Sequence, residues 1–286
     1  MKVLVLGATG LLGNTVFRLL LEKNFDAFGT ARRDDAKSLF SADLASRLLQ
    51  TVTLEDLDEL TAVIDRCAPD VVVNCAAVGR PVPTDAMRSV AIYAVLPQRL
   101  AYLSRNRGFR LIQISSDGVF SGRRGSYSET DVPDATDVYG AAKLLGEVTG
   151  AGAVTLRLSL VGRELVGRSG LLEWFLTQQG TCNCYRRAIF SGLTNLEIAK
   201  VICDVILPRN SLNGLYHVAG PAISKYDLLR HIADGYKKDI ILVPDDTVQI
   251  DRSLKMDRFH AATGYIAPPW PMMINEMRNN NFGLPR

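Results

Sequence analysis

The sequence predicts an α/β fold in which a doubly wound parallel sheet is followed by a smaller C-terminal lobe. Short runs rich in valine and leucine alternate with amphipathic segments over the first 162 residues, and the alternation loosens afterwards. Strands and helices that alternate at such spacing form a parallel sheet with helices on both faces. We therefore expect two units, residues 1–162 and 163–286, with the second packed against the first and partly interleaved with it.

Five strands are predicted in the first unit. Most are short apolar runs that stop at a glycine or a polar residue, as is typical of strands buried on both faces. Apolar residues at helical spacing fill the intervals between them. The predicted strands are residues 2–7, 25–31, 69–77, 109–116 and 153–162, and the predicted helices are residues 11–24, 54–67, 87–106 and 139–150.

The second unit has a weaker pattern. Its predicted elements are helices at residues 171–180, 194–207 and 224–236 and a strand at residues 214–220. Ser224 is the expected N-cap of the third helix, because its side chain can accept from the first free N–H groups. The prolines of residues 267–273 predict that this segment has no regular structure.

The composition argues against several classes of protein. A net charge of +3 without a run of like charges is too mild for nucleic-acid binding. No apolar stretch has the length of a signal peptide core or of a membrane span. The five cysteines fit neither a disulfide framework nor the spacing of a metal site. We expect a cytoplasmic protein without a metal, a membrane or a nucleic acid as partner.

A glycine-rich turn, GATGLLG, follows the first predicted strand and opens the first predicted helix. Glycines at such a place permit a tight turn, close approach of a pyrophosphate and close packing of helix on strand. The start of the helix presents free N–H groups to the anion. This context predicts a Rossmann-type dinucleotide site that contains Gly7, Thr9, Gly10, Leu11, Leu12 and Gly13.

The end of the second predicted strand indicates which dinucleotide is bound. An NAD site offers an acidic side chain to the ribose hydroxyls about 20 residues after the loop. Here Arg32 and Arg33 come first, and Asp34 lies beyond the expected end of the strand. Guanidinium groups suit a 2′-phosphate by charge and by their forked donors. The prediction is NADP(H), with two solvated arginines as the alternative.

Tyr139 and Lys143 lie four residues apart in a predicted helix and therefore share a face. An ammonium group close to a phenol lowers its pKa and makes it a better acid or base near neutral pH. Ser116 ends a predicted strand, at the edge of the sheet where ligands bind. The combination of Ser116, Tyr139 and Lys143 downstream of a dinucleotide loop predicts a catalytic group.

These motifs resemble those of the extended short-chain dehydrogenase/reductases. The G-x-x-G-x-x-G spacing is that superfamily's form of the glycine loop, and VVVNCAA resembles its Asn-Ala-Ala motif at Asn74 and Ala76. Residues 114–147 resemble the dTDP-4-dehydrorhamnose reductase group, with Tyr127, Glu129 and Asp131 in matching places. Gly118 departs from the group, which has tyrosine there.

The resemblance implies an NADPH-dependent reductase of a nucleotide-activated 4-keto-6-deoxy sugar that serves polysaccharide synthesis. Tyr139 is then the general acid, Lys143 lowers its pKa, and Ser116 polarises the carbonyl. Tyr139 and Lys143 also hold the cofactor, as do Asn74 and Ala76. The resemblance places substrate binding in the second unit and leaves a homodimer open.

Six further residues are candidates for substrate binding. Asp117 could bind a sugar hydroxyl or cap the following loop, and Arg80 could hold a diphosphate or be solvated. His217 is more simply explained as a structural histidine on a strand. The substrate candidates are Arg80, Asp117, Val119, Phe120, Arg163 and Trp174.

Two other functions remain open at the level of sequence. An NAD-dependent nucleotide-sugar epimerase or dehydratase would have the same fold, but Arg32, Arg33 and the Asp117–Gly118 pair argue against it. Some relatives of the reductase group are regulatory subunits, notably that of methionine adenosyltransferase. A non-catalytic NADP-binding subunit is therefore the third hypothesis.

Overall fold

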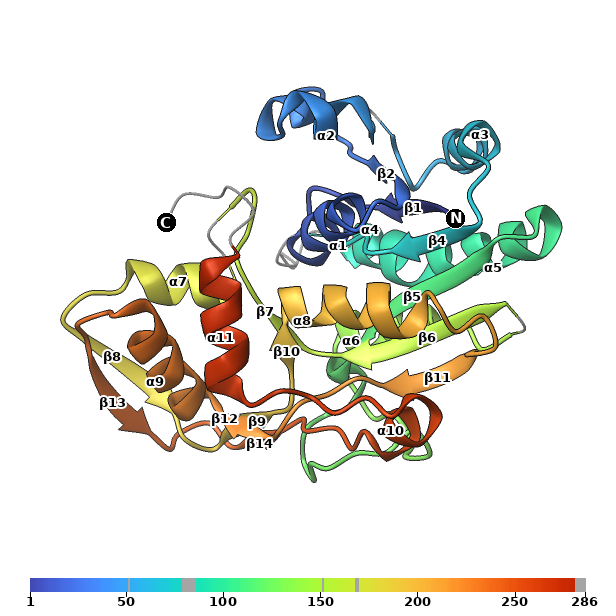
Figure 1. Ribbon diagram of the computed structural model, residues 1–286. Helices are drawn as coiled ribbons and strands as arrows, with labels where there is room; N and C mark the ends of the chain where they lie inside the picture. Colours follow the sequence, from blue (N-terminus) through green and yellow to red (C-terminus); the bar gives the residue numbers. More distant parts are fainter. Residues whose placement is uncertain (51, 79–85, 151, 168–169, 281–286) are drawn as a thin grey trace.

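A seven-stranded parallel sheet forms the centre of the computed structural model, which describes residues 1–50, 52–78, 86–150, 152–167 and 170–280 (Figure 1). The strand order is β11-β6-β5-β4-β1-β2-β3, so the doubly wound α/β prediction is confirmed. The strands are β1 (Lys2–Leu6), β2 (Asp26–Thr30), β3 (Leu48–Leu49), β4 (Val71–Asn74), β5 (Arg110–Ser116), β6 (Ala153–Leu158) and β11 (Gly214–His217).

Helices cover both faces of this sheet. Because side chains of a strand point alternately to opposite faces, Val3 and Val5 of β1 lie in one core and Leu4 and Leu6 in the other. The first core contains α1 (Leu11–Glu22) and α8 (Asn195–Lys200), which continues as a π-helical segment (Val201–Ile206). The second core contains α3 (Leu57–Cys67), α5 (Leu96–Arg107) and α6 (Val138–Leu145).

A π-helical segment (Ala91–Val95) joins α4 (Ala86–Val90) to α5, so the single helix predicted at residues 87–106 contains a π turn. This turn widens the helix locally and fits it closely against α6. A Cβ atom at Gly146, directly after α6, would lie 1.8 Å from the carbonyl oxygen of Tyr93. Only glycine allows this approach.

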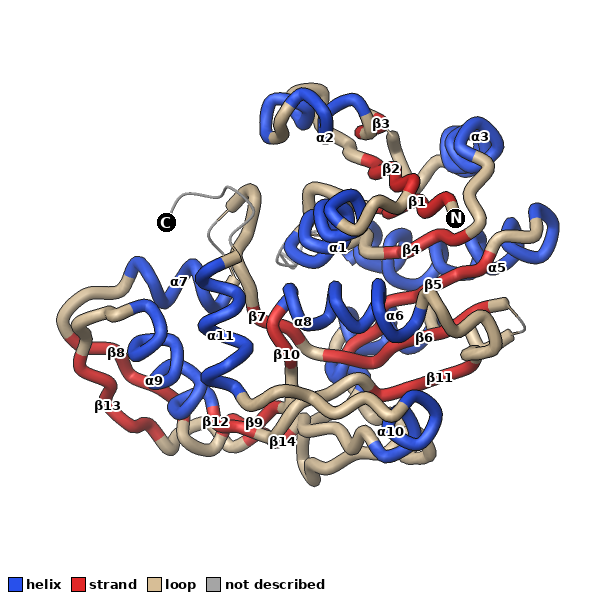
Figure 2. The backbone as a smooth tube through the Cα atoms, viewed as in Figure 1, coloured by secondary structure: helices blue, strands red, loops and turns tan. Residues whose placement is uncertain are grey.

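The C-terminal lobe contains short strands and helices beside the central sheet (Figure 2). Its strands form three small sheets: β7 with β10, β9 with β12 and β14, and β8 with β13. The elements are β7 (Leu160–Val161), α7 (Leu171–Thr177), β8 (Thr181–Tyr185), β9 (Ala188–Phe190), β10 (Leu193–Thr194), β12 (Ile223–Ser224), α9 (Lys225–Tyr236), β13 (Ile241–Asp245), β14 (Ile250–Asp251), α10 (Asp257–Thr263) and α11 (Trp270–Asn279). A short α2 (Ala42–Ser46) follows β2 in the first unit.

One prediction for this lobe is wrong. Residues 267–273 were expected to lack regular structure, but α11 begins at Trp270. Pro269 is its N-cap and Pro271 lies in its first turn, where the N–H that proline lacks would have no helical partner. The prolines therefore start this helix and do not prevent it.

The second half of the chain also contributes to the central layer. β11 pairs with β6, and α8 packs against α1, although both come from beyond residue 162. Asn195 at the start of α8 donates from Nδ2 to Thr15 Oγ1 of α1 at 2.8 Å. The two halves thus share the core of the sheet.

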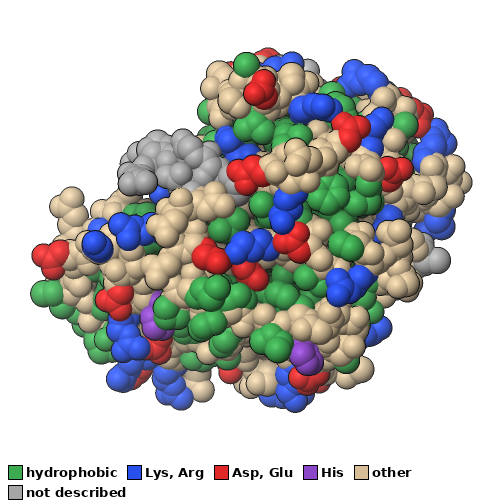
Figure 3. Space-filling model, in the orientation of Figure 1, with side chains coloured by type: hydrophobic (Ala, Val, Ile, Leu, Met, Phe, Trp, Pro, Cys, Tyr) green, Lys and Arg blue, Asp and Glu red, His purple; other side chains and the backbone are tan. Residues whose placement is uncertain are grey.

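Charged side chains are spread over the surface of the protein. Figure 3 shows acidic and basic side chains interspersed over the face in view. Among the described residues, no helix is both long and apolar enough to cross a bilayer. All five cysteines are buried and free.

A buried ion pair joins the end of α6 to the central sheet. Arg157 of β6 donates from Nε and Nη2 to the two carboxylate oxygens of Glu147, each at 2.7 Å. The side chains are 3% and 8% exposed. Ser115 Oγ of β5 donates to the same carboxylate at 2.7 Å. The carboxylate is thus satisfied from two neighbouring strands.

Replacing Arg157 by methionine (Arg157→Met) is expected to lower the free energy of unfolding by about 3–5 kcal/mol, because Glu147 would remain buried without its counter-ion. Urea unfolding measures this change. The matched control is Arg107→Met, which removes a similar pair with Asp65 that is exposed to solvent. The control should leave stability almost unchanged. Equal small losses in the two variants would contradict the role of the buried pair.

Candidate active site

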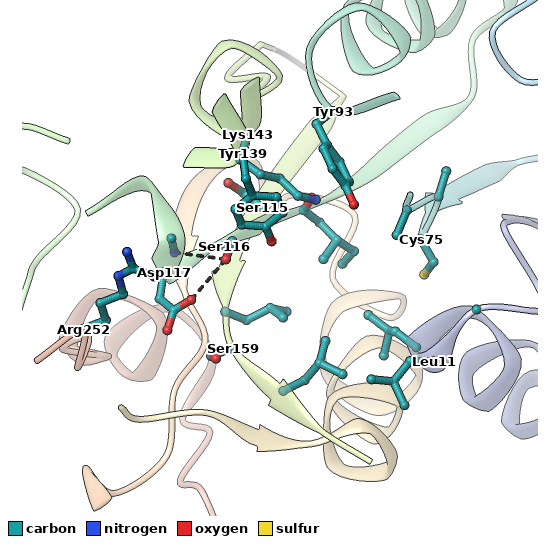
Figure 4. A pocket seen from close by; sticks show the side chains of 18 residues that line it. Leu11, Cys75, Tyr93, Ser115, Ser116, Asp117, Tyr139, Lys143, Ser159 and Arg252 are labelled. Atoms are coloured by element: carbon teal, nitrogen blue, oxygen red, sulfur yellow. Dashed lines mark hydrogen bonds between the residues drawn. The ribbon is translucent and has the colours of Figure 1, made fainter. Parts of the chain in front are cut away.

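A cavity of about 400 Å³ lies at the carboxyl edge of the central sheet, within the range of ligand sites (Figure 4). Several parts of the chain line it. Ser115, Ser116 and Asp117 come from the end of β5, and Tyr139 and Lys143 come from α6. The remaining wall includes Ser159, after β6, and Arg252, from the C-terminal lobe.

The glycine loop lies beside this cavity and is shaped by close backbone contacts. Gly7 has a φ of +78°, a conformation that strongly favours glycine. A Cβ atom at Gly13 would lie 2.2 Å from the carbonyl oxygen of Gly7. The Gly7 N–H donates to Thr30 Oγ1 at 3.1 Å, which ties the loop to the end of β2. The loop needs glycine at both places.

A second cavity of about 380 Å³ runs from the glycine loop to the end of β2. It shares Gly10, Cys75, Ala76 and Ala77 with the first cavity, so the two adjoin. Thr9 lines the second cavity, whereas Leu11 and Leu12 line the first. Together the two cavities form a trough that passes over the start of α1, whose N-terminus has no side-chain cap.

This trough fits a dinucleotide by its own chemistry. The uncapped N–H groups at the start of α1 suit a pyrophosphate. Arg32 and Arg33 line the far end and are exposed. Arg33 is paired with Asp35 through both of its guanidinium branches. Arg88 also lines this end and is paired with Glu55 at 3.1 Å.

Asn74 supports the backbone at the end of β4. It is 2% exposed, its Nδ2 donates to Gln113 Oε1 at 2.8 Å, and its Oδ1 accepts from the Ala76 N–H at 3.2 Å. These bonds fix the chain at the end of β4 and bring the backbone at Ala76 to both cavities. The side chain of Asn74 is a structural element behind the trough.

Ser116 and Tyr139 meet inside the first cavity. Ser116 Oγ donates to Asp117 Oδ1 at 3.0 Å and accepts from the Gly118 N–H at 3.0 Å. A hydrogen bond with Ser116 also acts on the Tyr139 phenol. A Cβ atom at Gly118 would lie 2.8 Å from Tyr139 Cε1. Glycine at position 118 therefore lets the phenol pack directly against the backbone.

Lys143 is held by groups other than Tyr139. Its Nζ donates to the Ile114 carbonyl at 3.2 Å and lies 4.4 Å from the centre of the Tyr93 ring. Tyr93 also packs edge-on against Tyr139, with ring centres 5.2 Å apart. Burial lowers the pKa of Lys143 to about 8, although Cys75 and Glu147 oppose this.

The pKa of Tyr139 differs from the expectation. Burial raises the pKa of this phenol above its ordinary value, and Tyr93 and Asp117 act in the same direction. The hydrogen bond with Ser116 and the charge of Arg252 oppose this rise without outweighing it. The prediction that Lys143 lowers the pKa of Tyr139 is wrong for this structure, because the ammonium group is turned to Ile114 and Tyr93.

Comparison with known proteins agrees with this architecture. The family model described as the RmlD substrate-binding domain matches residues 1–259, most of the chain. The chain belongs to the RmlD substrate-binding domain family. The predicted resemblance to the dTDP-4-dehydrorhamnose reductase group is thereby confirmed.

The relatives of this RmlD-family chain include a subunit of another enzyme and a sugar-nucleotide reductase. Methionine adenosyltransferase 2 subunit beta of Danio rerio is 32% identical over 82% of this chain and 74% of its own length. A dTDP-4-keto-6-deoxy-D-glucose reductase of Streptomyces niveus is 33% identical over 50% of this chain and 45% of its own.

A solved structure has the same fold. The dTDP-4-dehydrorhamnose reductase of Bacillus anthracis, in complex with NADP, superposes with a TM-score of 0.80 over 97% of this chain and 98% of its own, at 19% identity.

The substrate candidates of this RmlD-family chain are not all at the cavity. Asp117 lines it, whereas Val119 and Phe120 are fully buried in a core cluster with Tyr127. Arg163 is paired with Glu173. Trp174 is 38% exposed on α7 and does not line the described cavity. Arg80 lies outside the described residues.

Three residues of this RmlD-family site were missed in the sequence. Tyr93 lies on the π turn and reaches the cavity edge, with its hydroxyl bonded to the backbone N–H of Val78 at 2.9 Å. Ser159 and Arg252 lie in irregular segments. No motif marks these residues; only the tertiary fold brings them to Tyr139. In the described chain, no group of His, Cys, Asp or Glu could hold a metal.

Substituting Gly118 by alanine (Gly118→Ala) is expected to displace the Tyr139 ring, because the added methyl group would overlap Cε1. Overpacking of this kind costs about 1–3 kcal/mol of stability. A crystal structure of the variant and urea unfolding measure the two effects. Gly150→Ala is the control, since nothing lies near a Cβ atom there. An unmoved ring in Gly118→Ala would show that the contact is unimportant.

Proposed function

We propose that this protein is an NADPH-dependent reductase that acts on a nucleotide-activated 4-keto-6-deoxy sugar. One observation carries the proposal: Ser116, Tyr139 and Lys143 line one cavity of the trough whose shape fits a dinucleotide. A reductase needs a proton donor, a carbonyl-binding group and a cofactor site at one place. Membership of the RmlD family supports the same reaction class.

Tyr139 supplies the proton in this mechanism. A buried phenol whose pKa is raised stays protonated at neutral pH, which is the state that a general acid needs. The alkoxide that forms during reduction is a much stronger base and takes this proton. A phenol with a lowered pKa would serve the reverse reaction better. The raised pKa therefore agrees with Tyr139 as the proton donor.

Ser116 positions the carbonyl oxygen. Its hydroxyl is fixed by the Gly118 N–H and by Asp117, so it points into the cavity beside the phenol. A substrate oxygen between Ser116 and Tyr139 would accept a hydrogen bond from the phenol, and a second one from Ser116 once its hydroxyl proton turns from Asp117 to the substrate. Ser116 thus binds and polarises, and Tyr139 donates.

Lys143 acts on the cofactor side of the site. Its ammonium group lies between the end of β5 and Tyr93, and the side chain lines the first cavity. We assign to it the binding of the nicotinamide ribose, together with the backbone at Ala76. NADPH, when bound along the trough, supplies the hydride for the carbonyl carbon. Arg32 and Arg33 would hold its 2′-phosphate.

The family supports a proposal for the substrate and for the cellular setting. The Streptomyces niveus relative is named as a reductase of a dTDP-linked keto sugar, and we propose a substrate of this class. Such a reaction serves polysaccharide synthesis. Five free cysteines are typical of the cytoplasm, where we place the protein.

A second candidate is a regulatory subunit that binds NADP without turnover. The 32% identity to methionine adenosyltransferase 2 subunit beta over 82% of the chain favours it. The two candidate functions can be distinguished at Tyr139, because only the reductase needs the hydroxyl group of this residue.

Removing that hydroxyl (Tyr139→Phe) is expected to lower the rate of NADPH oxidation with dTDP-4-keto-6-deoxyglucose about 10²–10⁴-fold, because the general acid is lost. Absorbance of NADPH measures the rate, and calorimetry measures NADPH binding. Tyr102→Phe, at an exposed tyrosine of α5, is the control and should keep full activity. Wild-type protein that binds NADPH but reduces no keto sugar would favour the regulatory subunit.

Substituting both Arg32 and Arg33 by serine is expected to reduce the preference for NADPH over NADH by about 10- to 100-fold, because charged hydrogen bonds to the 2′-phosphate are lost. Dissociation constants of the two cofactors give the preference. Arg47→Ser removes an exposed arginine that lines neither described cavity and is the control. An unchanged preference would place the 2′-phosphate elsewhere.

A further inference from the structure

Asp117 and Arg252 come together on the wall of the cavity that faces Tyr139 (Figure 4). Asp117 follows Ser116 directly, and one of its oxygens, Oδ1, accepts from Ser116 Oγ at 3.0 Å. Arg252 comes from the C-terminal lobe, directly after β14. The carboxylate is thus one residue away from the group that we expect to bind the carbonyl.

The guanidinium group of Arg252 has unused hydrogen-bonding capacity. Within the described part of the chain, its buried Nε has no hydrogen-bond partner. Its interaction with Asp117 is coulombic, and no hydrogen bond joins the two side chains. A buried donor without a partner costs free energy, so a ligand that satisfies it gains affinity.

The backbone holds Arg252 firmly in place. Its N–H donates to the Ile189 carbonyl of β9 at 3.0 Å. Its neighbour Ser253 accepts at its carbonyl oxygen from the Tyr127 N–H at 2.9 Å. A Cβ atom at Gly122 would lie 2.9 Å from Arg252 Cγ, so the loop after β5 packs against the stem of the side chain. The donor is therefore preorganised.

Lys225 is a second cationic residue whose charge acts on Asp117. It is the first residue of α9, and its Nζ lies 3.6 Å from the centre of the Phe190 ring. It does not line the described cavity, but its charge acts on Asp117. Burial raises the pKa of Asp117, and the hydrogen bond from Ser116 and the charges of Lys225 and Arg252 oppose this rise.

We propose that Asp117 and Arg252 recognise a hydroxyl group on the sugar carbon next to the reacting carbonyl, and so select a substrate that retains this hydroxyl. A hydroxyl group can donate to the carboxylate and accept from the guanidinium at the same time. A substrate without the hydroxyl would leave the buried Nε of Arg252 without a hydrogen-bond partner, which is the condition for strong discrimination.

This proposal rests on the proposed function, because the reductase mechanism sets how the substrate is oriented in the cavity. The hydroxyl recognition can nevertheless fail while the proposed reductase holds, and the reverse. Binding and turnover are measured with two pairs of ligands that differ only at carbon 3. For binding, dTDP-6-deoxyglucose is compared with its 3-deoxy analogue by calorimetry on the NADP⁺-loaded protein. For turnover, the corresponding 4-keto sugars are compared with NADPH.

The wild type is expected to prefer the hydroxylated ligand by at least about 100-fold in kcat/KM and to show the same direction in binding. Arg252→Met should reduce this preference to a few-fold, mainly by weakening the hydroxylated ligand. Arg252→Lys, which retains the charge, should keep part of the preference. Arg230→Met, at an exposed arginine of α9, is the control and should behave like the wild type.

The outcomes separate the two claims. A preference in binding without turnover would overturn the proposed reductase and leave the hydroxyl recognition in place. Turnover of both keto sugars at equal efficiency, or equal losses for both in Arg252→Met, would overturn the recognition and leave the reductase. Failure of the wild type to bind either ligand at millimolar concentration would overturn both.

Discussion

The buried ion pair between Glu147 and Arg157 is the contact on which the site depends. Glu147 follows α6, the helix that carries Tyr139 and Lys143, and its carboxylate also accepts from Ser115 at the end of β5. One charged group therefore sets the distance between the helix of the general acid and the strand of the carbonyl-binding serine. Because an unpaired charge is so costly in this place, α6 cannot shift along the sheet without breaking the pair.

Most of the first unit and the centre of the site can be predicted from local sequence patterns. Apolar runs and the glycine loop predict the strands and the dinucleotide trough, since buried parallel strands and phosphate loops have few alternatives in residue type. Ser116, Tyr139 and Lys143 could be found because each belongs to a motif within a single element. All three line the predicted edge of the sheet.

The parts that sequence reasoning missed depend on contacts between distant segments. Arg252 and Ser159 lie in irregular chain, and nothing local distinguishes them from solvated residues. The pKa of Tyr139 was predicted in the wrong direction because spacing shows that Lys143 shares a helix face, whereas burial and the partners of the ammonium decide its effect. Val119 and Phe120 match a family motif, yet they support the wall from within the core.

A strand from the second half of the chain, β11, completes the central sheet, and this has a consequence for folding. β6 has a free edge until residues 214–217 arrive to pair with it, and α1 lacks its partner until α8 is made. A growing chain of 162 residues thus exposes an apolar strand edge, which is a template for aggregation. The glycine loop lies at the start of the chain, whereas Arg252 lies beyond residue 250, so the cavity wall that contains Arg252 is synthesised long after the loop.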